Sequence, residues 1–269
     1  MGELAGRIAL VTGGASGIGH ASSLALAREG ADVALTYFSS ADEARAVAAE
    51  IEALGRRALP IAVDVRDDAA VERAVKATLD QLGRVDFLVN NAGALYWQTL
   101  AQTPFKKFDL VMGVNVRGAF ACTHHVLPAM QAQGFGHVLM LSPPVDAGAS
   151  GGKIAYAISK FGMTLIAHGL AAEVRDQNIA ANALWPATMI ESLATINWGL
   201  GDRTLWRTPQ ILADATRLIF AKEPRTFTGH ALIDEDFLRA EGVTDFVRYR
   251  ADPSHEPPRV GFDFKLRAG

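Results

Sequence analysis

Residues 7–19 read Arg7-Ile8-Ala9-Leu10-Val11-Thr12-Gly13-Gly14-Ala15-Ser16-Gly17-Ile18-Gly19 and decide the fold expected for this chain. The apolar run predicts a buried parallel strand, and the glycine-rich turn leads into a helix that ends near Gly30. Glycines let the backbone approach a pyrophosphate closely, and the first amide groups of the helix point toward the anion. The spacing Gly-x-x-x-Gly-x-Gly differs from the common Gly-x-Gly-x-x-Gly pattern, so the turn alone is weak evidence of a phosphate site.

Strands and helices alternate along the rest of the chain. This alternation predicts an α/β fold of the Rossmann type, a doubly wound parallel sheet whose ligands bind beyond the carboxyl ends of the strands. We expect one domain over residues 1–240, with a small helical lid at about 188–206, and a tail over 241–269 that is extended along the surface or a neighbouring subunit. Further strands are expected at 32–37, 57–63, 84–90, 136–142, 179–185 and 228–233, and helices at 41–54, 67–82, from about 104, through 156–160 and from 208.

Composition narrows the class of protein. The chain has 269 residues, 49% of them hydrophobic, and a formal net charge of -3, which suits one sizeable domain. No basic stretch favours nucleic acid, and no apolar run is expected to reach the roughly 20 residues that cross a bilayer. The first strand begins within a few residues of Met1, so a cytoplasmic location is expected. The single cysteine, Cys122, is expected to be a buried, inert thiol. The histidines lack the spacing of a metal site.

Tyr156 and Lys160 stand four residues apart at the start of a predicted helix, so both side chains lie on one helix face. An ammonium beside a phenol favours the phenolate, which makes this tyrosine a candidate acid/base catalyst. Taken alone, such a pair is more often a feature of a helix surface.

Polar residues and glycines follow three of the predicted strands. They are Gly13, Asp64 and the run Asn90-Asn91-Ala92-Gly93. An aspartate after a strand is ordinarily a helix cap, but Asp67 is better placed for capping, which leaves Asp64 free to face a ligand. Asn115, in the helical region after 104, is either a tolerated polar residue or part of the same site.

Together these motifs resemble the short-chain dehydrogenase/reductase family. The similarity runs over about residues 5–235 and rests on TGGASGIG (12–19), Asp64-Val65, NNAG (90–93), Asn115, YAISK (156–160) and Pro186, in the family's order. LSPP (141–144), NALWP (182–186) and FTGHALIDED (227–236) resemble more closely the hydroxysteroid dehydrogenase-like type 2 branch and related bacterial enzymes.

The resemblance implies a nicotinamide cofactor and assigns residues to it. Gly13, Gly17 and Gly19 are implied to hold the pyrophosphate, and Asp64 and Val65 the adenine. Residues 91–93 are implied to meet the adenosine ribose and to form the floor of the site. Further cofactor contacts are implied for Ser16, Ile18, Ser39, Thr188 and Ile190.

The resemblance also implies the chemistry. Tyr156 is expected to exchange a proton with the substrate oxygen, while Lys160 holds the nicotinamide ribose and lowers the tyrosine pKa. Asn115 is expected to anchor a water on the proton path to Lys160. The implied activity is the interconversion of an alcohol and its aldehyde or ketone by a homo-oligomer, a dimer or tetramer.

This sequence departs from the family at the catalytic serine, which normally stands thirteen positions before the tyrosine. That position is Pro143, which has no hydroxyl, and Ser142 precedes it. Successive strand residues point to opposite faces, which aims Ser142 away from Tyr156. However, the prolines that follow restrict the backbone and can turn it back toward the cleft. We therefore predict that Ser142 takes over the donor role, with the opposite orientation as the alternative.

Two further departures concern the cofactor and the sixth strand. The usual Pro-Gly after that strand is Pro186-Ala187. Residues 36–40, at the end of the second strand, contain neither the acid that binds a ribose 2'-hydroxyl nor the arginine that pairs with a 2'-phosphate. Ser16 stands where many NADP-dependent members carry a basic residue. Because no carboxylate repels a 2'-phosphate and Ser39 and Ser40 can donate to it, NADP(H) is favoured slightly over NAD(H).

The segment after residue 188 suggests the kind of substrate. Trp198, Leu200 and Trp206 follow Trp185 and are expected to wall a site for an apolar substrate, unless they pack against the body of the protein or a partner subunit. An alternative function stays open at this point, a cofactor-binding scaffold or redox sensor with little catalysis, because a fold and a nucleotide site do not establish turnover.

Overall fold

The structure is a computed structural model, and it describes residues 2–144 and 150–260. Seven strands pair in parallel to form one sheet in the order β3-β2-β1-β4-β5-β6-β9. The order reverses between β1 and β4, where such sheets open a crevice for ligands. The bounds are β1 Ile8–Val11, β2 Asp32–Tyr37, β3 Ala58–Ala62, β4 Phe87–Asn90, β5 Gly136–Leu141, β6 Ile179–Trp185 and β9 Ala231–Ile233.

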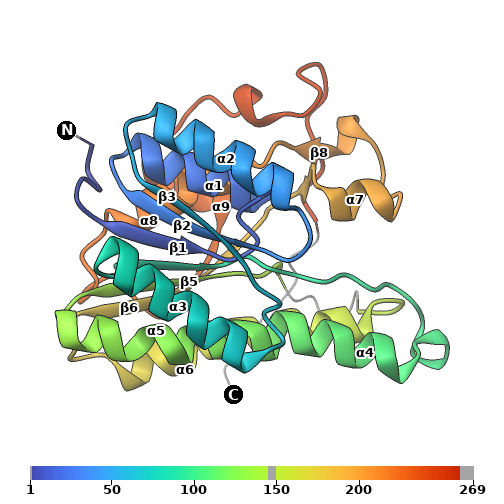
Figure 1. The fold of residues 1–269 in the computed structure, drawn as a ribbon. Coiled ribbons are helices and arrows are strands. Elements are labelled where there is room, and N and C mark those ends of the chain that lie inside the picture. The colour runs from blue at the N-terminus through green and yellow to red at the C-terminus, as the bar shows by residue number, and fades with distance from the viewer. Residues whose placement is uncertain (1, 145–149, 261–269) are drawn as a thin grey trace.

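Helices cover both faces of the sheet, which confirms the predicted doubly wound α/β fold (Figure 1). One face carries α1 Gly17–Arg28, α2 Ala41–Ala53, α8 Gln210–Phe220 and α9 Asp234–Ala240. The other carries α3 Asp68–Leu82, α5 Ala119–Gln133 and α6 Ile154–Glu173. The chain enters α5 through a 3-10 turn, η1 Leu100–Gln102, then α4 Phe105–Val111 and a π-helical turn, η2 Met112–Gly118.

Alternating strand residues supply the two layers of the core. In β1, Ala9 and Val11 pack on the α1 side, while Ile8 and Leu10 pack on the α3 side, and all four are buried. A strand that is buried on both faces reads as a continuous apolar run rather than as an alternation of apolar and polar residues. The apolar stretch at residues 8–11 therefore lies at the centre of a single domain.

Most elements lie where the sequence predicts them. The strands expected at 32–37 and 179–185 have those bounds, and Asp67 caps α3 by accepting a hydrogen bond from the Ala70 amide at 3.2 Å. The last strand is shorter than expected and begins at Ala231 instead of 228. Its first expected residue, Thr228, uses its hydroxyl to accept from the Ala181 amide at 2.9 Å, which replaces a rung of the ladder.

The lid region and the segment after residue 241 pack together on the body. The lid contains β7 Met189–Ile190, α7 Leu193–Asn197, η3 Arg203–Leu205 and β8 Trp206–Arg207, and η4 Val247–Tyr249 follows α9. Arg207 is 1% exposed and donates to carboxylates of Glu235 in α9 and Glu256 in the last segment. Tyr249 is fully buried, so residues 242–260 belong to the same compact body.

Helix α6 is long and apolar enough by length and composition to span a bilayer, which the sequence analysis did not expect of any segment. It is the one such helix in the described part of the chain, and no more than that follows from its composition. In the structure, its face with Met163, Ala167 and Leu170 packs in the core beneath β5 and β6.

Candidate active site

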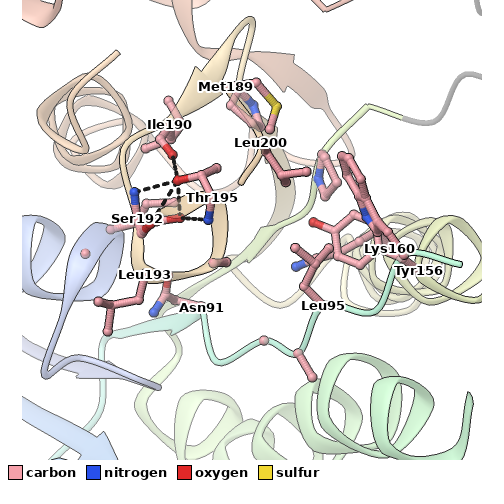
Figure 2. Close-up of a pocket in the computed structure, with 18 of the residues that line it drawn as sticks. Asn91, Leu95, Tyr156, Lys160, Met189, Ile190, Ser192, Leu193, Thr195 and Leu200 are labelled. Atoms are coloured by element: carbon pink, nitrogen blue, oxygen red, sulfur yellow. Dashed lines mark hydrogen bonds between the residues drawn. The ribbon is translucent and has the colours of Figure 1, made fainter. Parts of the chain in front are cut away.

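A cavity of about 540 Å³ opens beyond the carboxyl ends of β1, β4, β5 and β6. Figure 2 shows Tyr156 and Lys160 on one side of it and the lid residues Ser192 and Thr195 on the other. Within the described residues, no group of three or more His, Cys, Asp or Glu could hold a metal. Eleven predicted site residues line the cavity: Gly13, Ser16, Gly17, Ile18, Asn91, Ala92, Gly93, Tyr156, Lys160, Thr188 and Ile190.

The glycine turn has the shape that a phosphate site needs. Gly13 and Gly17 have φ values of +63° and +52°, which glycine adopts far more readily than other residues. A Cβ on Gly17 would meet only the Ser192 Cβ, at 3.9 Å, so this position borders open space. Since α1 begins at Gly17, its first amide groups stand beside that space. The turn therefore fits a pyrophosphate group.

Gly19 has a different role from the one expected. It does not line the cavity, because it is buried inside the turn. A Cβ there would lie 2.2 Å from the carbonyl oxygen of Gly13 and 2.6 Å from Asn91 Nδ2. Gly19 is thus needed for the close contact between α1 and the end of β1, and the expected direct contact with the pyrophosphate is corrected.

Asn91 locks the ends of β1 and β4 together. Its Nδ2 donates to the carbonyl oxygens of Thr12 and Gly13 at 2.9 and 3.0 Å. In return, the Thr12 hydroxyl accepts hydrogen bonds from the amides of Asn91 and Ala92, both at 3.0 Å. The NNAG motif therefore holds the glycine turn in place as well as lining the cavity.

Tyr156 and Lys160 extend from α6 into the cavity, as their spacing predicts (Figure 2). Lys160 Nζ lies 5.9 Å from the centre of the Tyr156 ring and donates to the Leu141 carbonyl at 3.0 Å. Burial lowers the pKa of Lys160 to about 8 and raises the pKa of Tyr156. Burial therefore keeps Tyr156 a protonated phenol at neutral pH, which corrects the expected lowering of its pKa by Lys160.

Asn115 lies in the π-helical turn and does not line the cavity. Its Nδ2 donates to the Ala94 carbonyl at 3.0 Å and to the Ser159 hydroxyl at 2.9 Å, and its Oδ1 accepts from the Ala94 amide at 2.7 Å. A Cβ on Gly93 would be 3.6 Å from Asn115 Oδ1 and 3.7 Å from Lys160 Nζ. Asn115 thus holds the loop after β4 against α6, and its expected water stays a prediction.

Ser142 does not reach the cavity, which corrects the predicted donor role. Ser142 is 1% exposed, and its hydroxyl lies 3.0 Å from the Thr164 hydroxyl and accepts from Trp185 Nε1 at 3.2 Å. Thr164 is two helical turns beyond Tyr156, roughly 12 Å along α6. Pro143, at the family's serine position, does line the cavity. The alternation of strand residues therefore persists to Ser142, and the prolines do not turn it back.

The residues assigned to the adenine end lie outside the cavity. The Asp64 carboxylate accepts from Arg66 at 2.6–3.1 Å and this bond lowers its pKa, while its contact with the adenine stays a prediction. Val65 is 7% exposed and packs on η2, where a Cβ on Gly118 would meet it at 2.8 Å. Ser39 is exposed at the end of β2, so it is accessible but not enclosed.

Several residues that line the cavity were not predicted, and most of the tryptophans that were expected to wall the substrate site do not line it. Of that set, Leu200 lines the cavity, whereas Trp185 packs on the core and Trp206 is buried with its Nε1 donating to the Leu200 carbonyl at 3.0 Å. Trp97 lines the cavity instead, with its ring 6.2 Å from the Tyr156 ring. The apolar run after NNAG was the available signal for it. Leu95, Pro144, Lys153, Met189, Ser192, Leu193, Thr195 and Val260 also line the cavity.

Comparison with known proteins decides the family, because the sequence profile described as short chain dehydrogenase matches residues 7–197. The chain belongs to the short-chain dehydrogenase/reductase family. It is 40% identical over 263 residues to hydroxysteroid dehydrogenase-like protein 2 of Xenopus tropicalis, which supports that branch. The match covers 94% of this chain and 63% of that relative, so the chain spans less than two thirds of its length.

Solved structures agree with the fold. A putative dehydrogenase from Xanthomonas campestris superposes with a TM-score of 0.91 at 37% identity, covering 96% of this chain and 98% of that one. A short chain dehydrogenase from Burkholderia cenocepacia in complex with NADP gives a TM-score of 0.77 at 30% identity, covering 86% and 97%. The family is one of NAD(P)-dependent oxidoreductases acting on CH-OH groups, and this chain is a member with a nucleotide-binding fold.

Proposed function

We propose that this chain interconverts an apolar alcohol and its aldehyde or ketone, with Tyr156 as the acid/base and NADP(H) as the slightly preferred cofactor. The observation that carries the proposal is the position of Tyr156 and Lys160 in the same cavity as the glycine turn. The mostly apolar lining from Leu95, Met189 and Leu200 supports an apolar substrate.

The residues present fit a nicotinamide dinucleotide. Gly13 and Gly17 offer the pyrophosphate site, and Thr188 and Ile190 approach from the lid side. When bound, the nicotinamide supplies or accepts the hydride. Lys160 carries the ammonium that would meet the ribose hydroxyls.

In the direction of carbonyl reduction, Tyr156 donates its proton to the substrate oxygen. The raised pKa of the phenol keeps this proton available at neutral pH. Pro143 offers neither a hydroxyl nor an amide hydrogen, so the second donor that the family places there is missing. Losing one such donor costs on the order of 3 kcal/mol in the transition state. We therefore propose a site that relies on Tyr156 for proton transfer and works more slowly than a family member with the serine.

A panel of aliphatic, terpenoid and steroid alcohols tests the proposal, with turnover followed by nicotinamide absorbance and Tyr156→Phe protein as the blank. Turnover of medium-chain or terpenoid alcohols above the blank supports it. Cofactor binding without turnover of any alcohol or carbonyl compound would instead favour the scaffold or redox-sensing alternative. Faster turnover of sugars or short hydroxy acids would contradict the apolar site.

A further inference from the structure

The charges in the cavity wall are unbalanced. Of the described residues that line the cavity, Lys153 and Lys160 are charged, and none is a carboxylate. Lys160 Nζ is already engaged with the Leu141 carbonyl and stands beside Tyr156. The Lys153 ammonium lies 5.3 Å from the centre of the Trp97 ring and forms no ion pair within the described part of the chain. The proposed hydride transfer assigns no role to this second cation.

Several intervening residues separate Lys153 from the phosphate turn within the cavity wall. Contacts lead from Gly13 to Asn91, and a Cβ on Gly93 would be 3.7 Å from Lys160 Nζ. From there, Lys160 is beside Tyr156, whose ring contacts Trp97, whose ring in turn contacts Lys153. The phosphates would lie near Gly13 and Gly17, whereas Lys153 is joined to Tyr156 through Trp97, so a substrate held at Tyr156 is nearer to Lys153 in this series of contacts than the phosphates are.

The surroundings of Lys153 favour an anion. Lys153 is the N-cap of α6, a helix of 20 residues with no acidic residue in its first turn, so the positive end of the helix dipole adds to the ammonium. The Trp97 ring attracts the ammonium and keeps it at the cavity wall. Leu95 and Leu200 line the same cavity, so a ligand that satisfies the whole site has an apolar body and one negative group.

We propose that Lys153 is a specificity-determining residue that pairs with a carboxylate on the substrate, which makes the preferred substrate a hydroxy or oxo acid with an apolar chain. This inference rests on the proposed function. During oxidation, the bound nicotinamide would accept the hydride from the carbinol carbon, and the deprotonated form of Tyr156 would accept the hydroxyl proton. The carboxylate keeps all its bonds and serves only to orient the chain against Lys153 and Trp97.

Calorimetry of the cofactor-loaded protein tests the pairing without requiring turnover. The probes are apolar hydroxy acids of graded chain length and their methyl esters, which differ only in charge at one end. We expect the best acid to bind wild-type protein about tenfold more tightly than its ester. Lys153→Met keeps an aliphatic stem on Trp97, so it should remove this difference and leave ester binding unchanged, and Lys153→Arg should restore it.

Equal affinity of acid and ester across the series would overturn the inference. An equal loss of both ligands in Lys153→Met would also overturn it, because it would show that Lys153 only supports the Trp97 loop. These failures differ from failure of the proposed function. Turnover of neutral alcohols without any preference for acids would contradict this inference alone. Absence of all turnover would contradict the proposed function, and calorimetry would still show whether binding depends on the charge of the ligand.

Discussion

The hydroxyl oxygen of Ser142 lies 3.0 Å from that of Thr164, inside the protein between the end of β5 and α6. The Trp185 indole donates to both hydroxyl oxygens at 3.2 Å, so the three side chains form a closed hydrogen-bonded group. Ser142 is thus satisfied by partners other than substrate. In the proposed mechanism, proton transfer therefore depends on Tyr156 and Lys160.

Ser142→Ala should therefore leave kcat within about threefold of wild type and lower stability by about 1–2 kcal/mol through the lost hydrogen bonds. Tyr156→Phe should reduce kcat by at least about a hundredfold, since it removes the acid/base group, while cofactor affinity is retained. Steady-state kinetics and thermal unfolding of the two variants check this. A hundredfold loss of kcat in a well-folded Ser142→Ala enzyme would return Ser142 to the mechanism.

Substitutions at Gly17 and at Gly19 should have different effects on stability and on cofactor binding. Gly17→Ala places its Cβ toward open space at a positive φ, so we expect a loss of about 1 kcal/mol in stability and weaker cofactor binding. Gly19→Ala forces a Cβ against the Gly13 carbonyl, so we expect a loss of about 3 kcal/mol in stability. Chemical denaturation and cofactor calorimetry separate the effects, and a Gly19→Ala protein as stable as wild type would contradict the close contact.

Ser39 provides the test of cofactor preference. It is exposed just after the end of β2, and residues 36–40 contain no carboxylate that would repel a 2'-phosphate. Ser39→Asp should raise the Kd of NADP(H) by about tenfold and leave or improve that of NAD(H). Ser39→Ala is the matched neutral control. Tighter binding of NAD(H) than NADP(H) by the wild-type protein would show the preference to be wrong.

Burial of the charged Lys160 side chain should lower the free energy of unfolding by a measurable amount. Burial lowers its pKa from 10.5 to about 8, so its charged form is disfavoured in the folded protein. Because the folded pKa lies below the unfolded one, this cost is full below pH 8 and fades as the pH rises from about 8 to 10.5. Lys160→Met should abolish activity yet raise the free energy of unfolding at pH 7 by about 1–3 kcal/mol.

Unfolding of both proteins between pH 6 and pH 11 checks this, with about equal stability expected at the alkaline end. A Lys160→Met protein less stable than wild type at neutral pH would mean that the bond to the Leu141 carbonyl outweighs the cost of burying the charge.

Local patterning was enough to predict the order of strands and helices, because a strand or helix is encoded by residues that are neighbours in sequence. The apolar run at residues 8–11 and the Tyr156–Lys160 spacing are examples, and both lie where they were predicted. The same reasoning placed Gly13, Gly17 and Asn91 at one edge of the sheet, since parallel strands end together.

The sequence by itself therefore determined the Rossmann-type fold, the glycine turn and the presence of a tyrosine and a lysine on one helix face. The tertiary structure decided which side chains face the cavity. Ser142 points to Thr164 and Asp64 to Arg66, Gly19 packs closely against the Gly13 carbonyl, and Trp97 and Lys153 line the wall. These outcomes depend on contacts between elements distant in sequence or on the direction of a side chain. Local periodicity encodes neither the distant contacts nor the side-chain directions.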